Sequence, residues 1–327
     1  MNFWLLKKKT VNFIFLSMFY SIFFNLFLSF LFSRFDFFNP IYFCPPKILC
    51  EANGGGRAYL PRTADTPIFV RHAGVPDPEL LAKNSAVLAA EPNVFLWGKK
   101  AEEPQAIASI SKLMTALVFL DHNPGWETTY RITAQDSIGG GRNNLFLGDT
   151  IKIHDLFYTS LVSSDNGATL ALVHSTGLSE DEFVELMNVK AKTIGMFSSS
   201  FVEPTGLSDR NRASARDVAR LAREALRQPE LKKAVTTKTY NFKTLEDREK
   251  KLTNTDELLS DEWSKISVLG GKTGYTESAG YCFVGQFKNE EGKEIISVVL
   301  GAPSKGARFS ETKKLVNWIF DSYEINR

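Results

Sequence analysis

Residues 108–116 read Ala-Ser-Ile-Ser-Lys-Leu-Met-Thr-Ala. Apolar residues continue at helical spacing as far as Leu120, which predicts a buried helix that begins near Ser109. Ser109 and Lys112 are three residues apart, so on a helix they share one face. Burial would keep the lysine amine neutral, because desolvation disfavours its charged form. A neutral Lys112 can accept the proton of Ser109 as that hydroxyl attacks a carbonyl.

The spacing of Ser109 and Lys112 is weak evidence by itself. The same spacing recurs at Ser310 and Lys313, on what is predicted to be a solvent-facing helix. A helix start whose lysine extends its amine to water explains such a pair without any catalysis. Further motifs are therefore needed to assign a reaction.

A second polar segment, Ser164-Asp165-Asn166, separates two predicted helices at His154–Val162 and Gly167–His174. Ser, Asp and Asn are preferred helix N-cap residues, so capping explains the triplet. Alternatively, the triplet projects from a tight loop, where Ser164 transfers protons and Asn166 binds a substrate amide. Both interpretations stay open at this point.

A third segment, Gly270-Gly271-Lys272-Thr273-Gly274, follows a predicted strand at Ile266–Leu269. A phosphate-binding loop would require glycine at position 266 and a helix afterwards, but Ile266 stands there and another strand follows. The segment instead predicts a strand edge. There Lys272 and Thr273 can meet an anionic group, and Gly274 lets a substrate backbone approach closely.

Composition argues against several classes of protein. The net charge of +2 implies no nucleic-acid partner. The three cysteines, Cys44, Cys50 and Cys282, do not have the pattern of a disulfide framework. The four histidines lack the spacing of a zinc site.

The N-terminus differs in composition from the rest of the chain. Lys7-Lys8-Lys9 precede an uncharged run, residues 10–33, which at about 24 residues is long enough to span a bilayer. The basic flank predicts residues 1–9 in the cytoplasm and the rest of the chain outside it. We favour an uncleaved signal anchor, with cleavage as a signal peptide and release as the alternative. Lipidation at Cys50 is also open, although Leu49 is not the small residue expected before it.

Small or polar residues recur at every fourth position of this run, at Ser17, Ser21, Asn25, Ser29 and Ser33. Such a stripe lets two membrane helices approach closely, which predicts weak self-association. Chance dilution of a phenylalanine-rich helix is the simpler explanation of the same spacing.

Proline and glycine punctuate residues 34–84, which we interpret as a linker and lead-in. The catalytic domain is expected at 85–327. Its predicted helices mix with strands, and Tyr281–Phe287 and Ile295–Leu300 flank a hairpin signal at Asn289–Gly292. This pattern predicts an α+β fold, in which helices cover both faces of an antiparallel sheet.

Ser-x-x-Lys, Ser-Asp-Asn and Lys-Thr-Gly occur here in the order that marks penicillin-recognising serine acyltransferases. On these motifs the chain resembles the serine-type D-alanyl-D-alanine carboxypeptidases, the low-molecular-mass penicillin-binding proteins. The resemblance spans roughly residues 85–325. It includes Thr205-Gly206-Leu207, Ser214-Ala215-Arg216-Asp217 and Ala307-Arg308-Phe309. It implies a fold of the β-lactamase/DD-peptidase type.

The resemblance implies an acylation and deacylation cycle on peptidoglycan stem peptides. Ser109 would attack the carbonyl between two terminal D-alanines, with Lys112 as its general base. Ser164 and Lys272 would relay a proton to the departing D-alanine. β-Lactams would acylate the same serine and act as covalent inhibitors. Neither a metal nor an organic cofactor is implied.

The resemblance also implies how the substrate is held. Asn166 would bind a peptide amide. Thr273 and Arg308 would receive the terminal carboxylate, which a guanidinium matches in shape and charge. The backbone N–H groups of Ser109 and Tyr275 would form the oxyanion hole, because negative charge develops on that oxygen in the transition state.

Two alternatives remain. Ser-Asp-Asn is also the form found in class A β-lactamases, which use a glutamate to activate the deacylating water. On that interpretation, Glu203 would be this glutamate. Leu207 stands where their loop carries asparagine, so we favour the carboxypeptidase and expect Glu203 to make local hydrogen bonds. A non-catalytic wall-binding protein on the same fold is the other alternative. The sequence does not decide whether the acyl group passes to water or to another peptide.

Overall fold

The computed structural model describes residues 68–137, 139–140 and 143–326. The expected membrane segment at 10–33, its small-residue stripe and Cys50 lie outside these residues. Among the described residues, no helix is both long enough and apolar enough to cross a membrane. Cys282 is a buried free thiol.

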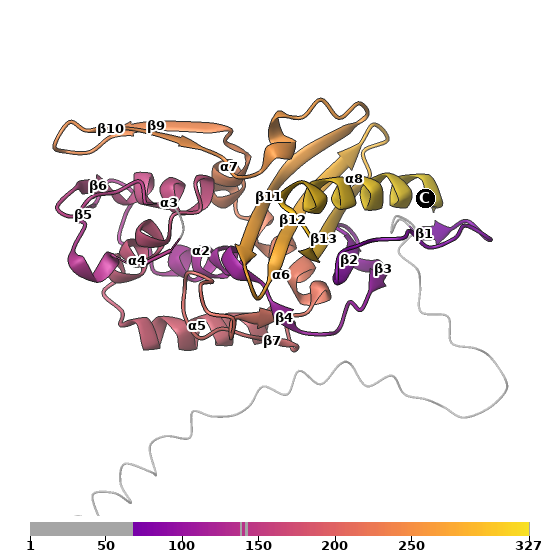
Figure 1. Cartoon of the computed structure of the whole chain (residues 1–327), viewed down its shortest axis with the longest axis horizontal. Coiled ribbons are helices and arrows are strands. Elements are labelled where there is room, and N and C mark those ends of the chain that lie inside the picture. The colour runs from indigo at the N-terminus through magenta and orange to yellow at the C-terminus, as the bar shows by residue number, and fades with distance from the viewer. Residues whose placement is uncertain (1–67, 138, 141–142, 327) are drawn as a thin grey trace, which may run out of the picture. The chain divides into compact units, whose positions relative to one another are not determined.

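The centre of the fold is an antiparallel sheet of five strands in the order β11-β12-β13-β2-β3 (Figure 1). These strands are β11 (Ile266–Thr276), β12 (Gly280–Asn289), β13 (Glu294–Ala302), β2 (Asn84–Ala89) and β3 (Val94–Lys99). The predicted hairpin at Asn289–Gly292 joins β12 to β13. β11 continues as a strand through Lys272 to Thr276, as the argument against a phosphate-binding loop predicted.

Helices cover both faces of this sheet, so the predicted α+β architecture is confirmed. The C-terminal helix α8 (Lys305–Ser322) packs on one face and α6 (Ala215–Arg227) on the other. Successive side chains of β12 point to opposite faces of the sheet. Phe283 therefore joins the core under α8, and Val284 joins the core under α6. Ser304 caps α8, since its side chain accepts a hydrogen bond from the Ala307 N–H at 3.1 Å.

A mainly helical part packs beside the sheet. Its central helix α2 (Ser111–Asp121) is buried along nearly its whole length. Around it lie α3 (Ile153–Val162), α4 (Asn166–Ser175) and α5 (Glu180–Thr193), while α7 (Pro229–Thr236) packs against α3, α6 and β11. The helices expected near Ser109, at His154–Val162 and at Gly167–His174 correspond to α2, α3 and α4. Short turns η1 (Ala108–Ile110), η2 (Ala134–Asp136) and η3 (Glu257–Ser260) connect elements.

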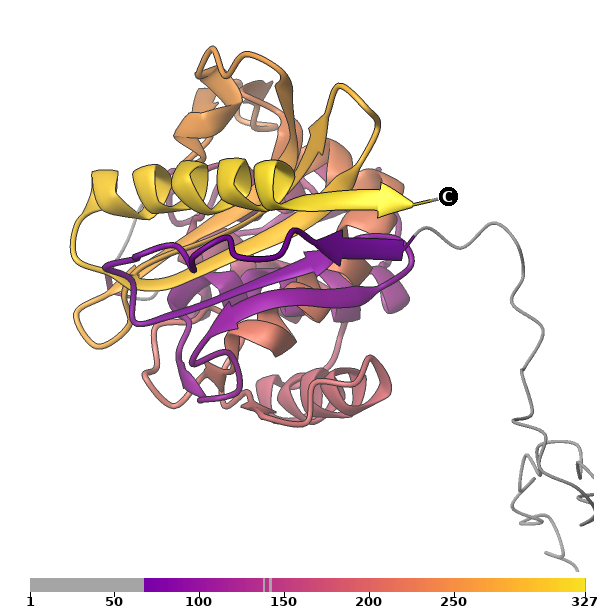
Figure 2. The same cartoon turned by 90° about the vertical axis from the view of Figure 1, so that its right-hand side faces the viewer.

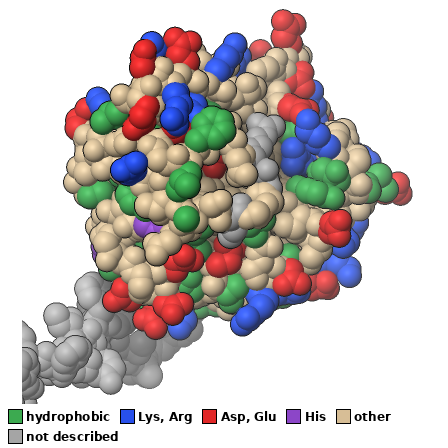
Figure 3. All heavy atoms as spheres, turned by 60° about the vertical axis from the view of Figure 1, so that its left-hand side comes forward, with side chains coloured by type: hydrophobic (Ala, Val, Ile, Leu, Met, Phe, Trp, Pro, Cys, Tyr) green, Lys and Arg blue, Asp and Glu red, His purple; other side chains and the backbone are tan. Residues whose placement is uncertain are grey.

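Small ladders complete the fold. They are β4 (Gln105–Ala106) with β8 (Arg212–Ala213) and β7 (Ser199–Ser200), β5 (Thr129–Arg131) with β6 (Thr150–Lys152), and β9 (Thr239–Lys243) with β10 (Glu249–Thr253). The hairpin of β9 and β10 projects from the body of the fold (Figure 1). Acidic and basic side chains are interspersed over the face in Figure 3, so that face offers no single-sign surface for recognition.

The chain joins the fold earlier than the sequence indicated. Strand β1 (Ile68–Arg71) lies inside the stretch expected to be a linker and lead-in, and it pairs with β14 (Tyr323–Asn326). Figure 2 shows these two strands side by side at the edge of the fold. Neither was predicted, because a ladder between segments some 250 residues apart leaves no periodic signal in either segment.

We predict that Phe283→Ala lowers the free energy of unfolding by about 3–5 kcal/mol, measured by denaturant titration. Its ring is fully buried and packs edge-on against Phe309 at 5.3 Å between centroids, so truncation leaves a cavity. The matched control is Phe197→Ala, since Phe197 is 80% exposed and its loss should change stability by less than about 0.5 kcal/mol. Equal effects of the two substitutions would contradict this assignment of the core.

Candidate active site

A cleft of about 750 Å³ lies where the helical part meets strand β11. It is lined by side chains from all three sequence motifs. The helical part contributes Ser109, Ser164 and Asn166, β11 contributes Thr273, Gly274 and Tyr275, and α8 contributes Arg308. The two lysines of the motifs, Lys112 and Lys272, are buried beneath its surface. The structure thus brings together residues that are up to about 200 positions apart in the chain.

Ser109 lies on the short turn η1. Two other segments approach this turn closely because each carries a glycine at the point of contact. A Cβ atom on Gly206 would lie only 2.1 Å from the Ala108 carbonyl oxygen, and one on Gly274 would lie 2.7 Å from that of Ile107. Ala108 itself has φ of +50°, a conformation that is costly for a residue with a side chain. The backbone at the nucleophile is therefore held in place by its neighbours on both sides.

The amine of Lys112 is enclosed by three oxygen atoms. Its Nζ lies 2.6 Å from Asn166 Oδ1, 2.6 Å from the Thr205 carbonyl oxygen and 3.1 Å from Ser109 Oγ. Burial lowers the pKa of Lys112 to about 7, and the negative charges of Glu203 and Asp165 limit this shift. A neutral amine can donate to the first two oxygens and present its lone pair to the Ser109 hydroxyl.

Ser164 faces a second buried lysine. The Nζ of Lys272 donates to Ser164 Oγ at 2.7 Å and to the Thr273 carbonyl at 3.0 Å. Ser164 has φ of +61°, which is unusual for serine and indicates that the surrounding contacts impose its orientation. The cation and the hydroxyl together make a path along which a proton can pass within the cleft.

The two interpretations of Ser164-Asp165-Asn166 apply to different members of the triplet. Asp165 is the N-cap of α4, accepting from the Ala168 N–H at 2.9 Å, and it also accepts from the Asn144 N–H at 2.7 Å. Asn166 lines the cleft instead, and its amide donates to the Gly140 carbonyl at 2.9 Å. Asp165 therefore helps to hold in place Ser164 and Asn166, the two polar residues on either side of it.

Thr273, Tyr275 and Arg308 form the wall opposite these groups. Thr273 Oγ1 donates to Thr255 Oγ1 at 2.6 Å. The Arg308 guanidinium is only 5% exposed and lies 3.4 Å from the Gly274 carbonyl oxygen, so its charge is held close to β11. The half-exposed ring of Tyr275 stacks on Tyr281, with 4.2 Å between centroids. This wall suits an anionic group with an apolar neighbour.

Comparison with known proteins agrees with this geometry. The family model described as D-alanyl-D-alanine carboxypeptidase matches residues 71–304. The chain belongs to this family.

Characterised relatives of the carboxypeptidase family differ in length. D-alanyl-D-alanine carboxypeptidase DacF of Bacillus subtilis is 31% identical over 253 residues, covering 75% of this chain and 64% of DacF. D-alanyl-D-alanine endopeptidase of Escherichia coli is 31% identical over 254 residues, covering 74% of this chain and 78% of the relative. The match thus spans a little under two thirds of DacF and more of the endopeptidase.

Solved structures support the same assignment. The Streptomyces K15 DD-transpeptidase superposes with a TM-score of 0.70 and 26% identity, covering 76% of this chain and all of that protein. The fold of the described residues is therefore the penicillin-binding DD-peptidase fold, as the sequence predicted.

In this member of the carboxypeptidase family, Glu203 is a structural residue of its loop. Its carboxylate accepts from the N–H groups of Thr205 and Gly206, each at 2.6 Å, and of Ser208 at 3.2 Å. It also accepts from the Asn211 amide at 3.0 Å. Glu203 is not among the described residues that line the cleft. These bonds hold the Thr205 carbonyl against Lys112, as expected for a residue with local hydrogen bonds.

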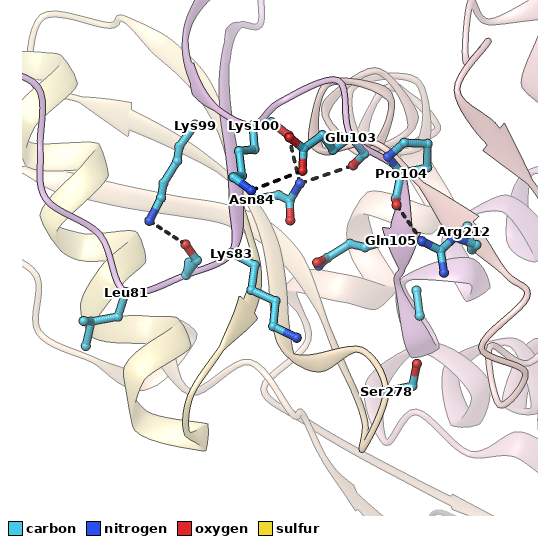
Figure 4. Close-up of a pocket in the computed structure, with 12 residues that line it drawn as sticks. Leu81, Lys83, Asn84, Lys99, Lys100, Glu103, Pro104, Gln105, Arg212 and Ser278 are labelled. Atoms are coloured by element: carbon cyan, nitrogen blue, oxygen red, sulfur yellow. Dashed lines mark hydrogen bonds and ion pairs between the residues drawn. The ribbon is translucent and has the colours of Figure 1, made fainter.

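A second hollow of about 510 Å³ lies at the start of β2 and the end of β3 (Figure 4). Lys99 donates there to the carbonyls of Leu80 at 2.6 Å and Ala82 at 2.9 Å. Lys100 lies 3.5 Å from Glu103 as an ion pair. Lys99 thus serves the local backbone and Lys100 a neighbouring carboxylate, and none of the motif residues is among the described residues that line the hollow. The chemistry therefore belongs to the first cleft.

Sequence reasoning missed several groups that shape the cleft. Gly140 and Thr205 act through backbone carbonyls, which any residue type carries, so no sequence pattern marks them. Thr255 and Asp256 lie just beyond β10, and nothing in their spacing connects them to Lys272-Thr273-Gly274.

We predict that acylation of Ser109 by a penicillin slows as the pH falls below about 7, approaching tenfold per unit. The reason is that protonation of Lys112 removes the lone pair that accepts the serine proton. Lys112→Met should lower the acylation rate constant by about 10²–10⁴-fold at every pH. Stopped-flow measurements from pH 5.5 to 8 would check both, with thermal unfolding as the control for folding. A pH-independent rate in the wild type would contradict Lys112 as the base.

Proposed function

We propose that this protein removes the terminal D-alanine from peptidoglycan stem peptides through an acyl-enzyme on Ser109. The observation that carries the proposal is the buried amine of Lys112, which lies 3.1 Å from Ser109 Oγ with its other two contacts already satisfied. A serine with a neutral amine beside it is the arrangement that acyl transfer requires. Membership of the carboxypeptidase family supports the same reaction.

In the first half of the reaction, Ser109 attacks the carbonyl between the two D-alanines while Lys112 accepts its proton. The backbone N–H groups of Ser109 and Tyr275 are the proposed oxyanion hole. The close approach of β11 to η1 at Gly274 supports this pairing, because it brings strand backbone against the turn that carries Ser109. Fixed donors of this kind stabilise the charge of the tetrahedral intermediate.

The departing D-alanine needs a proton on its amine. Ser164 lies in the cleft with its hydroxyl 2.7 Å from the Lys272 ammonium, so Ser164 can donate this proton and recover one from Lys272. The terminal carboxylate fits the opposite wall, where Thr273 offers a hydroxyl and Arg308 a buried positive charge. Asn166 holds the peptide amide. Water then releases the shortened peptide, and penicillins acylate Ser109 as covalent inhibitors.

We also propose that residues 10–33 anchor the protein in the membrane and place the catalytic domain outside the cytoplasm. The uncharged run, its basic flank and the location of peptidoglycan support this. We predict that the protein sediments with membranes and resists extraction by alkaline carbonate. Recovery in the soluble fraction with an N-terminus beyond residue 33 would show cleavage instead.

We predict that the full-length protein releases D-alanine from a peptide ending in D-Ala-D-Ala and forms a long-lived adduct with a fluorescent penicillin. Both activities should be lost in Ser109→Ala, since the hydroxyl forms the acyl bond. D-alanine assay and gel fluorescence would measure them. Rapid turnover of penicillin without peptide cleavage would favour the β-lactamase, and neither activity in the folded protein would favour a wall-binding role.

A further inference from the structure

A buried carboxyl lies behind the wall that is proposed to receive the substrate carboxylate. Asp256 precedes η3 and is only 2% exposed. Its Oδ1 accepts from the Leu258 N–H at 3.0 Å and so caps η3. Its Oδ2 is enclosed and has no hydrogen-bond partner among the described residues. An ionised carboxylate with one oxygen in this state is costly, because water cannot solvate it.

Asp256 is linked to the cleft by its neighbour in the chain. Thr255, the preceding residue, lines the cleft and accepts the hydrogen bond of Thr273. The carboxyl is therefore one residue away from a direct contact of the Lys-Thr-Gly strand. A change of charge on Asp256 acts on this wall at short range and through protein rather than water, where Coulomb interactions are strongest.

Three charged groups face Asp256, each from a different element. Arg308 on α8 and Lys272 on β11 favour its ionised form, and Glu257 on η3 opposes it. Arg308 also has a buried Nε atom without a hydrogen-bond partner among the described residues. Asp256 interacts electrostatically with both cations, while its Oδ1 is committed to the Leu258 N–H.

Burial is the largest influence on this group and raises the pKa of Asp256 to about 7. The carboxyl therefore gains or loses its charge close to neutral pH. Glu257, by contrast, is exposed and lies 2.6 Å from Lys305 as an ion pair. Asp256 and Glu257 thus differ in how far water can solvate their carboxyl groups.

We propose that Asp256 is a positioning residue that sets the affinity for the substrate's terminal carboxylate by gaining or losing a proton beside Arg308 and Lys272. When Asp256 is protonated, it carries no charge that opposes the attraction of the two cations for the substrate. When it is ionised, its negative charge offsets part of their attraction. This inference rests on the proposed function of the cleft, and it assigns to this chain a preference for acid conditions in substrate binding.

The sign of the effect distinguishes Asp256 from Lys112. As the pH rises through about 7, Asp256 becomes ionised and the KM for a peptide ending in a free carboxylate should rise. Over the same range Lys112 becomes neutral and kcat should rise. Asp256 therefore changes KM and Lys112 changes kcat, although both groups change charge near pH 7. Both constants can be measured by D-alanine release from pH 5.5 to 8.5 with the full-length protein in detergent.

Asp256→Asn is the decisive variant, because asparagine keeps the capping oxygen and the shape but cannot ionise. We predict that it removes the rise in KM, so that at pH 8 its KM is roughly five- to tenfold below that of the wild type, with similar values at pH 6. The matched control is Glu257→Gln, which removes an exposed negative charge near Arg308. That variant should lower KM modestly at every pH and keep the rise.

A substrate without the carboxylate gives a second control. The same peptide ending in D-alaninamide should show no rise in KM in either protein, since the attraction that Asp256 modulates is missing. A rise in KM that persists in Asp256→Asn, or that is equal for the amide, would overturn the proposal. A flat KM in the wild type with normal D-alanine release would overturn it too, while leaving the proposed function intact.

Two measurements keep the test independent of turnover. If no D-alanine is released, calorimetric binding of the peptide to Ser109→Ala at pH 6 and pH 8 still reports the affinity. Thermal unfolding reports the ionisation itself: a raised pKa means that wild-type stability falls as the pH rises from about 4, where the unfolded aspartate ionises, to about 7, where the folded one does. The Tm of Asp256→Asn should then exceed that of the wild type by more at pH 8 than at pH 5. A difference independent of pH would refute the inference.

Discussion

The burial of one lysine amine among three oxygen atoms is the constraint on which the rest of this structure depends. Lys112 lies inside a helix that is enclosed on almost every side, so its charged form is disfavoured and its amine can act as a base near neutral pH. The position of Ser109, the conformation of the Ser-Asp-Asn loop and the course of the loop at Glu203 all serve to build this enclosure.

Most of the surrounding polar residues hold other residues in place. Glu203 binds three backbone N–H groups of its own loop and thereby fixes the Thr205 carbonyl against Lys112. Asp165 caps α4 and leaves Asn166 to reach the same amine. The Glu203 carboxylate, which the β-lactamase alternative would use to activate water, is here committed to backbone donors.

Charge in the cleft is divided between two depths. Lys272 and Arg308 bring positive charge to the wall opposite Ser109, and Asp256 lies behind them in a place that water does not reach. Attack therefore depends on a lysine that has to be neutral, whereas binding depends on cations whose effect a buried carboxyl can reduce. The two requirements have opposite dependence on pH, which favours a narrow range near neutrality.

The sequence by itself determined the motif order, most helices, the main strands and the motif residues of the cleft. These follow from local properties: helical spacing around Lys112, Pro and Gly at the loops, and the extended Lys272-Thr273-Gly274 segment. Only the tertiary structure decided the pairing of β1 with β14, the role of the Thr205 carbonyl and the burial of Asp256. Long-range pairing, backbone contacts and desolvation depend on what surrounds a residue in space, and a residue's neighbours in the chain do not specify that.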